Sequence, residues 1–181
     1  MAEVDEAAEY WDARKFFEQF GPRIMDPTTA LRGAVSNEDL QARVVIAGQC
    51  LLDGADVTRV FGSERVSVVH VLLGQLSHDF EREPELLREI LIAGADVNGV
   101  STRWGTPLQT LAGTAKFTDE ELAPFYDVFF ARPDLDLLKR GYRGWSTLEM
   151  VRRNGPRRAG LLARVEQYLT ERGIVLPERD V

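Results

Sequence analysis

The chain has 181 residues, 44% of them hydrophobic, and a formal net charge of −7. This length and composition allow a hydrophobic core without metal or disulfide support, which excludes the small cross-linked protein classes. The acidic start and the lack of any run of about 18 apolar residues argue against a secretory signal or a membrane span, so we expect a cytoplasmic protein with no membrane partner. The single cysteine, Cys50, lies in an apolar segment and is expected to be buried.

The charges are unevenly distributed. Residues 131–164 contain nine Lys or Arg and three Asp or Glu, whereas residues 1–130 contain 11 basic and 22 acidic residues. A basic segment of this kind is typical of a site for an acidic protein surface or a phosphate backbone, and also of a plain solvated surface.

The first predicted element is an amphipathic helix within residues 1–26. Apolar and aromatic side chains recur along it at helical spacing, among them Trp11, Phe16 and Phe20. We expect this segment to cap the open end of a repeat array, and the alternative is that its aromatic side chains form a docking surface. At the other end, residues 177–181 are expected to be a tail.

Three apolar helical segments end in related sequences, and the recurrence predicts a repeat fold. They are LLDGADVT at 51–58, LIAGADVN at 91–98 and the more divergent FFARPDLD at 129–136. Glycine suits the left-handed residue just after a helix, so each turn is predicted to close one. A fixed spacing of this size is typical of stacked helical repeats.

A second pattern marks helix starts. A hydroxyl residue, a small or branched residue or proline, and an aliphatic residue follow one another from Thr29, Ser67, Thr106 and Ser146, at spacings of 38, 39 and 40 residues. Each hydroxyl is predicted to cap a helix. Further starts are predicted at Ser36-x-x-Asp39, Glu83-Pro84-Glu85, Thr118-x-x-Glu121 and Asn154 with Pro156.

These signals divide the chain into four helix–turn–helix units, with no strand of convincing length between them. The expected fold class is all-α, an α-solenoid of stacked repeats over residues 27–176 with an N-terminal capping helix. The unit boundaries are about 27–64, 65–103, 104–143 and 144–176.

Two motifs in these units resemble the ankyrin repeat family. Its helix start, Thr-Pro-Leu-His, is similar to Thr106-Pro107-Leu108-Gln109, and its Gly-Ala-Asp turn is similar to residues 91–98. The period of 38–40 exceeds the usual value of about 33 residues, and the excess lies mostly at residues 75–84 and 113–118. The resemblance implies finger loops along one edge, beside a concave face of short helices.

The sequence offers few residues for catalysis or metal binding. His70 and His78 have no cysteine pair nearby, and no nucleophile elbow or phosphate loop is present. The acidic runs at 81–85 and 119–121 lie at predicted helix N-termini, where negative charge is favourable without any catalytic role. We therefore expect no cofactor, no metal, no catalytic residue and no small-molecule substrate.

The loops between units carry the residue types that interfaces favour. Loop one is 58–66, loop two is 98–105 and loop three is 136–145. Arginine and aromatic side chains are enriched at binding hot spots. The candidate partner-binding residues are Arg59, Phe61, Arg103, Trp104, Arg140, Tyr142, Arg143 and Trp145. For Trp104 and Trp145 the alternative is that they fold back as plugs between units.

These observations favour a non-catalytic protein-interaction module that binds a folded, acidic partner through its finger loops and concave face. A sharper version is a bacterial inhibitor of a partner enzyme, of the immunity-protein type, which rests on fold analogy. The alternatives are an enzyme with an unrecognised carboxylate site and nucleic-acid binding through the basic segment, which the acidic remainder of the chain disfavours.

Overall fold

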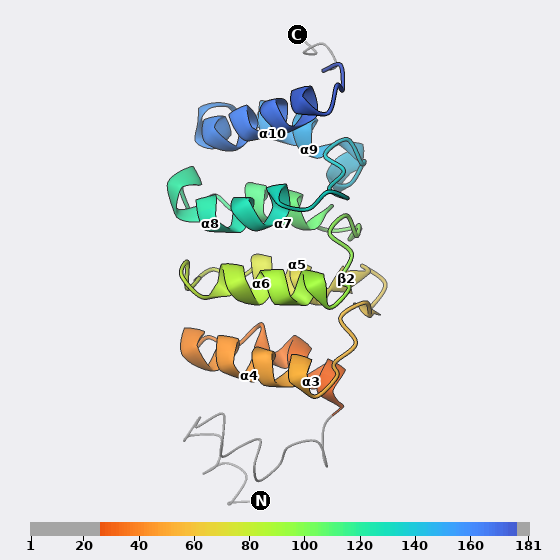
Figure 1. Ribbon diagram of the computed structural model, residues 1–181, viewed down its shortest axis with the longest axis vertical. Helices are drawn as coiled ribbons and strands as arrows, with labels where there is room; N and C mark the ends of the chain where they lie inside the picture. The colour runs from red at the N-terminus through yellow and green to blue at the C-terminus, as the bar shows by residue number, and fades with distance from the viewer. Residues whose placement is uncertain (1–25, 177–181) are drawn as a thin grey trace, which may run out of the picture. The chain divides into compact units, whose positions relative to one another are not determined.

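The structure is a computed structural model that describes residues 26–176 (Figure 1). The predicted capping helix and the tail 177–181 lie outside these residues. The described part is mostly helical, with one two-stranded sheet, β1 (Val60–Phe61) with β2 (Val66–Ser67). Its helices are α3 (Pro27–Ala34), α4 (Leu40–Leu52), α5 (Val68–Leu73), α6 (Glu83–Ile92), α7 (Pro107–Gly113), α8 (Asp119–Phe130), α9 (Thr147–Arg153) and α10 (Ala159–Glu171), with short 3-10 helices η1 (Tyr142–Gly144) and η2 (Gly155–Arg158).

The described residues form two compact units. The first contains residues 26–60 and 67–95, and the second contains residues 61–66 and 96–176. Within the first unit α3 packs on α5 and α4 on α6, and within the second α7 packs on α9 and α8 on α10. Each unit therefore contains two consecutive helix pairs, α3–α4 and α5–α6 in the first and α7–α8 and α9–α10 in the second. The first helices of the two pairs pack on each other, and so do the second helices. A continuous solenoid of four helix–turn–helix repeats, and the repeat boundaries expected from the sequence, remain predictions.

The chain is mostly helical, as expected, and one short two-stranded sheet in loop one departs from the all-α prediction. There, the branched and aromatic residues of β1 and β2 pair across a turn in which Gly62 has a φ of +66°. Such residues favour extended backbone, and glycine supplies the left-handed turn residue. The strands have two residues each, too few for an alternating pattern to reveal them.

Four helix starts follow the predicted capping pattern. Ser67, Thr106, Thr118 and Ser146 each accept a hydrogen bond from the backbone N–H three residues on, and the side chain of that third residue returns to the cap. Such reciprocal bonds satisfy N–H groups that a helix start leaves unpaired.

Three other predicted caps were wrong. The carboxylate of Asp26 caps α3, accepting from Thr29 N, so Thr29 is a donor rather than the cap. Asp39 caps α4 in place of Ser36. In both cases a carboxylate stands immediately before the first helical residue and provides a stronger acceptor than a hydroxyl. Asn154 donates its side-chain N–H to Ala112 O instead of capping α10.

The glycine turns close helices as predicted. Gly54 and Gly94 have φ of +84° and +112°, and Ala55 N and Ala95 N donate back to the carbonyls of Cys50 and Ile90. This is the Schellman arrangement. The same arrangement ends α10, where Ile174 N donates to Leu169 O after Gly173, a copy that the sequence pattern did not reveal.

A buried arginine holds the long loop between α5 and α6 in the first unit. Arg43, 1% exposed, donates from Nη1 to Ser77 O at 2.7 Å and to Glu83 Oε1 at 2.6 Å, and from Nε to Asn37 O at 2.9 Å. His78 Nδ1 lies 2.6 Å from the other oxygen of Glu83. Glu83 is itself fully buried at the first position of α6, so it serves as an internal counter-ion as well as a first-turn acid.

A second buried arginine holds the corresponding loop in the second unit. Arg158 is 0% exposed and donates to Ala112 O at 2.9 Å, to Phe117 O at 3.0 Å and to Thr114 O, all at the end of α7 or in the loop between α7 and α8. Its counter-ion is Asp119, at the first position of α8, 3.3 Å away. The extra length of the repeat is thus held in both units by one guanidinium and one helix-start carboxylate.

Candidate binding surface on the hairpin loops

The tips of all three loops are tight hairpins within the second unit. In loop one Arg65 N donates to Gly62 O at 3.2 Å. In loop two Ser101 and Gly105 exchange two backbone hydrogen bonds of 2.9 Å. In loop three Gly141 N donates to Trp145 O at 2.8 Å. Backbone closure of this kind fixes the direction in which the tip side chains project.

Neighbouring hairpins are joined to one another. Thr102 N donates to Glu64 O at 3.0 Å, and Arg103 lies 3.8 Å from the Glu64 carboxylate. Loops two and three are joined by the buried side chain of Gln109. Its Oε1 accepts from Thr106 N and from Tyr142 N, both at 2.9 Å, while Nε2 donates to the carbonyl of Trp145 at 2.8 Å.

Two glycines allow this close approach. A Cβ on Gly141 would stand 2.2 Å from Gln109 Oε1 and 3.0 Å from Thr106 N. A Cβ on Gly105 would stand 2.0 Å from the same oxygen and 2.5 Å from Tyr142 N. Atoms cannot approach so closely, so the junction requires glycine at both positions.

Arginine and aromatic side chains are concentrated on loop three and at the end of α9. We call Arg140, Tyr142, Arg143, Trp145 and Arg153 the arginine–aromatic cluster. The Tyr142 and Trp145 rings meet edge to face at 6.2 Å. The guanidinium carbon of Arg143 lies 5.2 Å and 5.8 Å from these two ring centroids, and that of Arg153 lies 4.8 Å from the Trp145 centroid.

The guanidinium groups of Arg143 and Arg153, which stack on these rings, are oriented in a way that suits binding. Both are exposed, and the ring contacts above are the direct contacts that the structure gives their guanidinium groups. A guanidinium over a ring is oriented by its flat face, which leaves its edge of N–H donors for a carboxylate. By contrast, Arg140 donates to Gly144 O at 2.7 Å and lies 3.6 Å from Glu149.

The backbone at Arg143 carries local strain. Its φ is +54°, a left-handed value that costs about 1 kcal/mol for a residue with a Cβ. Arg65 in the loop-one hairpin has the same φ of +54° but takes part in no cation–π contact that the structure shows. Comparing Arg65 with Arg143 therefore separates the effect of backbone strain on stability from the effect of the cation–π contacts.

We expect Arg65→Gly to raise the free energy of unfolding by about 0.5–1 kcal/mol, because glycine adopts this φ without strain. Arg143→Gly removes the same strain together with two ring contacts, each contributing about 0.5 kcal/mol at an exposed site, so its gain should be smaller. Urea denaturation of both variants measures the difference. Equal gains would show that the ring contacts do not hold Arg143.

The remaining predicted residues are spread along the other loops. Arg59 is 3.8 Å from Asp26 with 54% of its side chain exposed, and Phe61 is half-buried in β1. In loop two, Arg103 is exposed and stacks over the half-buried Trp104 at 5.7 Å. Arg153, Gln109 and Glu149 were not among the predicted binding residues, because their roles depend on contacts between separate elements. Gln109 occupies the position of the histidine in the ankyrin Thr-Pro-Leu-His motif. This correspondence was the sequence signal that could have identified it.

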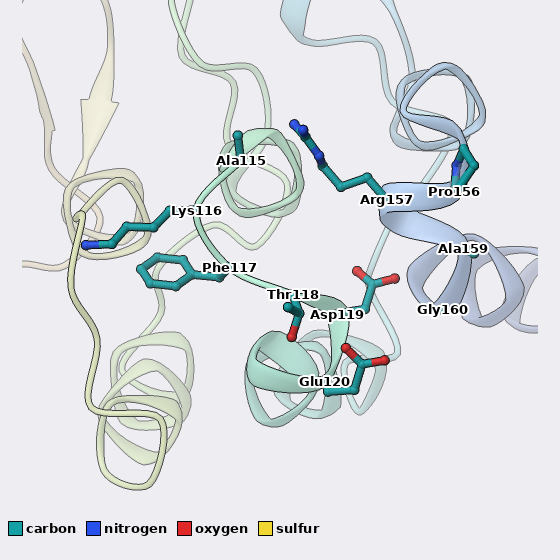
Figure 2. Close-up of a pocket in the computed structure, with 10 residues that line it drawn as sticks. All are labelled: Ala115, Lys116, Phe117, Thr118, Asp119, Glu120, Pro156, Arg157, Ala159 and Gly160. Atoms are coloured by element: carbon teal, nitrogen blue, oxygen red, sulfur yellow. The ribbon is translucent and has the colours of Figure 1, made fainter.

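A pocket of about 370 Å³ in the second unit is lined in part by acidic residues of α8 (Figure 2). Asp119 and Glu120 lie on its wall, while Lys116 and Arg157 extend away from them. Both oxygens of Asp119 are engaged: Oδ1 accepts from Tyr126 and Arg158, and Oδ2 accepts from Leu161 N at 3.0 Å. These bonds give Asp119 a structural role as the acceptor at the start of α10.

Within the described residues 26–176, no helix has the length and apolarity needed to cross a membrane. No group of three or more His, Cys, Asp or Glu side chains in this range is arranged to hold a metal ion.

Comparison with known proteins gives a likeness in fold. No protein-family model matches the chain, and no curated protein matches its sequence. The ankyrin repeat domain of human ASB11 superposes with a TM-score of 0.48 at 20% identity, over 75% of this chain and 53% of that one, which is too weak to support an argument. A functionally unknown protein from Leptotrichia buccalis C-1013-b superposes with a TM-score of 0.69 at 20% identity, over 87% of this chain and 86% of that one. The chain therefore shares its fold with the Leptotrichia protein, and its resemblance to the ankyrin family rests on the motifs in its own sequence.

Proposed function

We propose that the chain is a non-catalytic protein-interaction module that binds an acidic surface of a folded partner through its hairpin loops. The arginine–aromatic cluster is the centre of this surface, with Arg103 and Trp104 beside it on loop two. Stacked guanidinium groups and half-buried rings combine contact area with directional donors, as at binding hot spots.

The observation that carries the proposal is the exposed, strained Arg143 held between two aromatic rings. Its backbone would be more stable as glycine, and its side chain makes no hydrogen bond that the structure shows. A side chain presented at such a cost, with its donors toward solvent, is suited to an external carboxylate. An inhibitor of the immunity-protein type would use such a surface to occlude a partner enzyme.

The test starts with affinity purification of the tagged chain from its native cell, followed by binding measurements with the purified partner. The double variant Tyr142→Ala with Arg143→Ala should weaken binding by more than about tenfold, because it removes two hot-spot residues. Its melting temperature should change little. The matched control is Arg88→Ala, an exposed arginine of α6 that belongs to no hairpin loop, and it should bind within about twofold of the wild type. Equal affinity of the double variant, or turnover in a broad hydrolase screen, would contradict the proposal.

A further inference from the structure

One acidic side chain lies at the edge of the arginine–aromatic cluster. Glu149 is the third residue of α9, and its Oε2 accepts from Ser146 N at 2.6 Å and lies 3.6 Å from Arg140 Nη1. The hydrogen bond from the Ser146 backbone lowers the pKa of Glu149, with smaller contributions from Arg140 and Arg153. Glu149 is therefore ionised at neutral pH, which fixes a negative charge beside three exposed arginines.

The cap itself does not require this charge. In α7 the same position of an equivalent capping box is occupied by Gln109, which accepts from Thr106 N at 2.9 Å through a neutral amide. The chain thus contains both a neutral and a charged version of one motif. The negative charge of Glu149 is consequently separable from its role in helix capping.

We infer that Glu149 is a specificity-determining residue of the arginine–aromatic cluster, which favours the carboxylates of a protein surface over phosphate polyanions. A single carboxylate can approach Arg143 and Arg153 at their solvent-facing edges. A nucleic-acid strand carries a charge on every nucleotide, so a strand that follows the cluster also brings phosphates against Glu149. This inference rests on the proposed function, because it assigns the selectivity of the same surface.

The test measures binding of a fluorescent oligo(dT) of about 20 nucleotides at low ionic strength, where phosphate contacts are strongest. Glu149→Gln should keep the cap, as Gln109 does in α7, and should raise the affinity for oligo(dT) by about three- to tenfold. Glu120→Gln is the matched control, since Glu120 is exposed on α8 and the net charge changes equally. It should leave the affinity within about twofold. Addition of Arg143→Ala to Glu149→Gln should remove the gain.

Equal oligo(dT) binding by the wild type and Glu149→Gln, with both folded by circular dichroism, would overturn the inference. So would an equal gain in Glu120→Gln, which would show that only net charge matters. Neither result affects the proposed function, which depends on the affinity of the Tyr142 and Arg143 variants for the protein partner. If the protein partner instead bound the Tyr142 and Arg143 variants as tightly as the wild type, the proposed function would be overturned. That conclusion would hold regardless of how Glu149→Gln binds oligo(dT).

Discussion

Glu83→Gln should lower the free energy of unfolding by about 3–5 kcal/mol, the usual cost of removing one partner from a buried ion pair. Arg43 lies 2.6 Å from Glu83, and the two side chains are 1% and 0% exposed. Glutamine has nearly the same shape but no charge, so the variant leaves the Arg43 guanidinium buried without its counter-ion. Urea denaturation followed by circular dichroism measures the loss.

The control for this experiment is Glu85→Gln, two residues further along α6. Glu85 has 59% of its side chain exposed and pairs with Arg88 at the surface. Exposed pairs contribute between 0 and about 1 kcal/mol, so this variant should unfold almost as the wild type does. Similar losses for both variants would show that the cost arises from α6 itself, and the buried pair would then not hold the loop.

Gly141→Ala should have the second large effect, about 3 kcal/mol of destabilisation together with loss of partner binding. The added methyl group meets Gln109 Oε1 at 2.2 Å and the Thr106 backbone at 3.0 Å. Overpacking of this kind costs about 1–3 kcal/mol, and displacing Gln109 also breaks its hydrogen bonds to Tyr142 and Trp145. The measurement is chemical denaturation combined with affinity for the captured partner.

Gly48→Ala provides the opposite control. Gly48 lies inside α4, and a Cβ there meets no atom within 4 Å. Because alanine is the better helix former, this variant should be stabilised by about 1 kcal/mol and should bind normally. A neutral Gly141→Ala would mean that the hairpin junction tolerates displacement, and the fixed orientation of loop three would no longer hold.

The helix pairs could be predicted from the sequence because their signals are local. A hydroxyl at Thr106, a proline at the next position and a capping side chain at Gln109 lie within one turn. Gly54 and Gly94 mark helix ends for the same reason, since their left-handed φ is a property of the turn itself. Where two local candidates competed, as at the start of α4, the pattern did not distinguish Ser36 from Asp39.

The interactions that the sequence did not reveal join residues far apart in the chain. Arg43 and Glu83 are separated by 40 positions, and Arg158 and Ala112 by 46. In the sequence, Glu83 was one of several acids at a helix start, and only its burial beside Arg43 distinguishes it from Glu85. The arginine–aromatic cluster could be predicted in part: Tyr142, Arg143 and Trp145 do lie together, whereas the neighbouring Arg153 belongs to a helix end rather than to a loop.

The buried arginines also determine where the chain can be shortened. Repeat proteins are usually divisible at the borders between repeats, because each repeat contacts only its neighbours. Here Arg43 belongs to the first helix pair, but its counter-ion begins the second helix of the next pair. A fragment that ended between α4 and α5 would retain the arginine and lose Glu83, so each helix pair of the first unit depends on the other for charge balance.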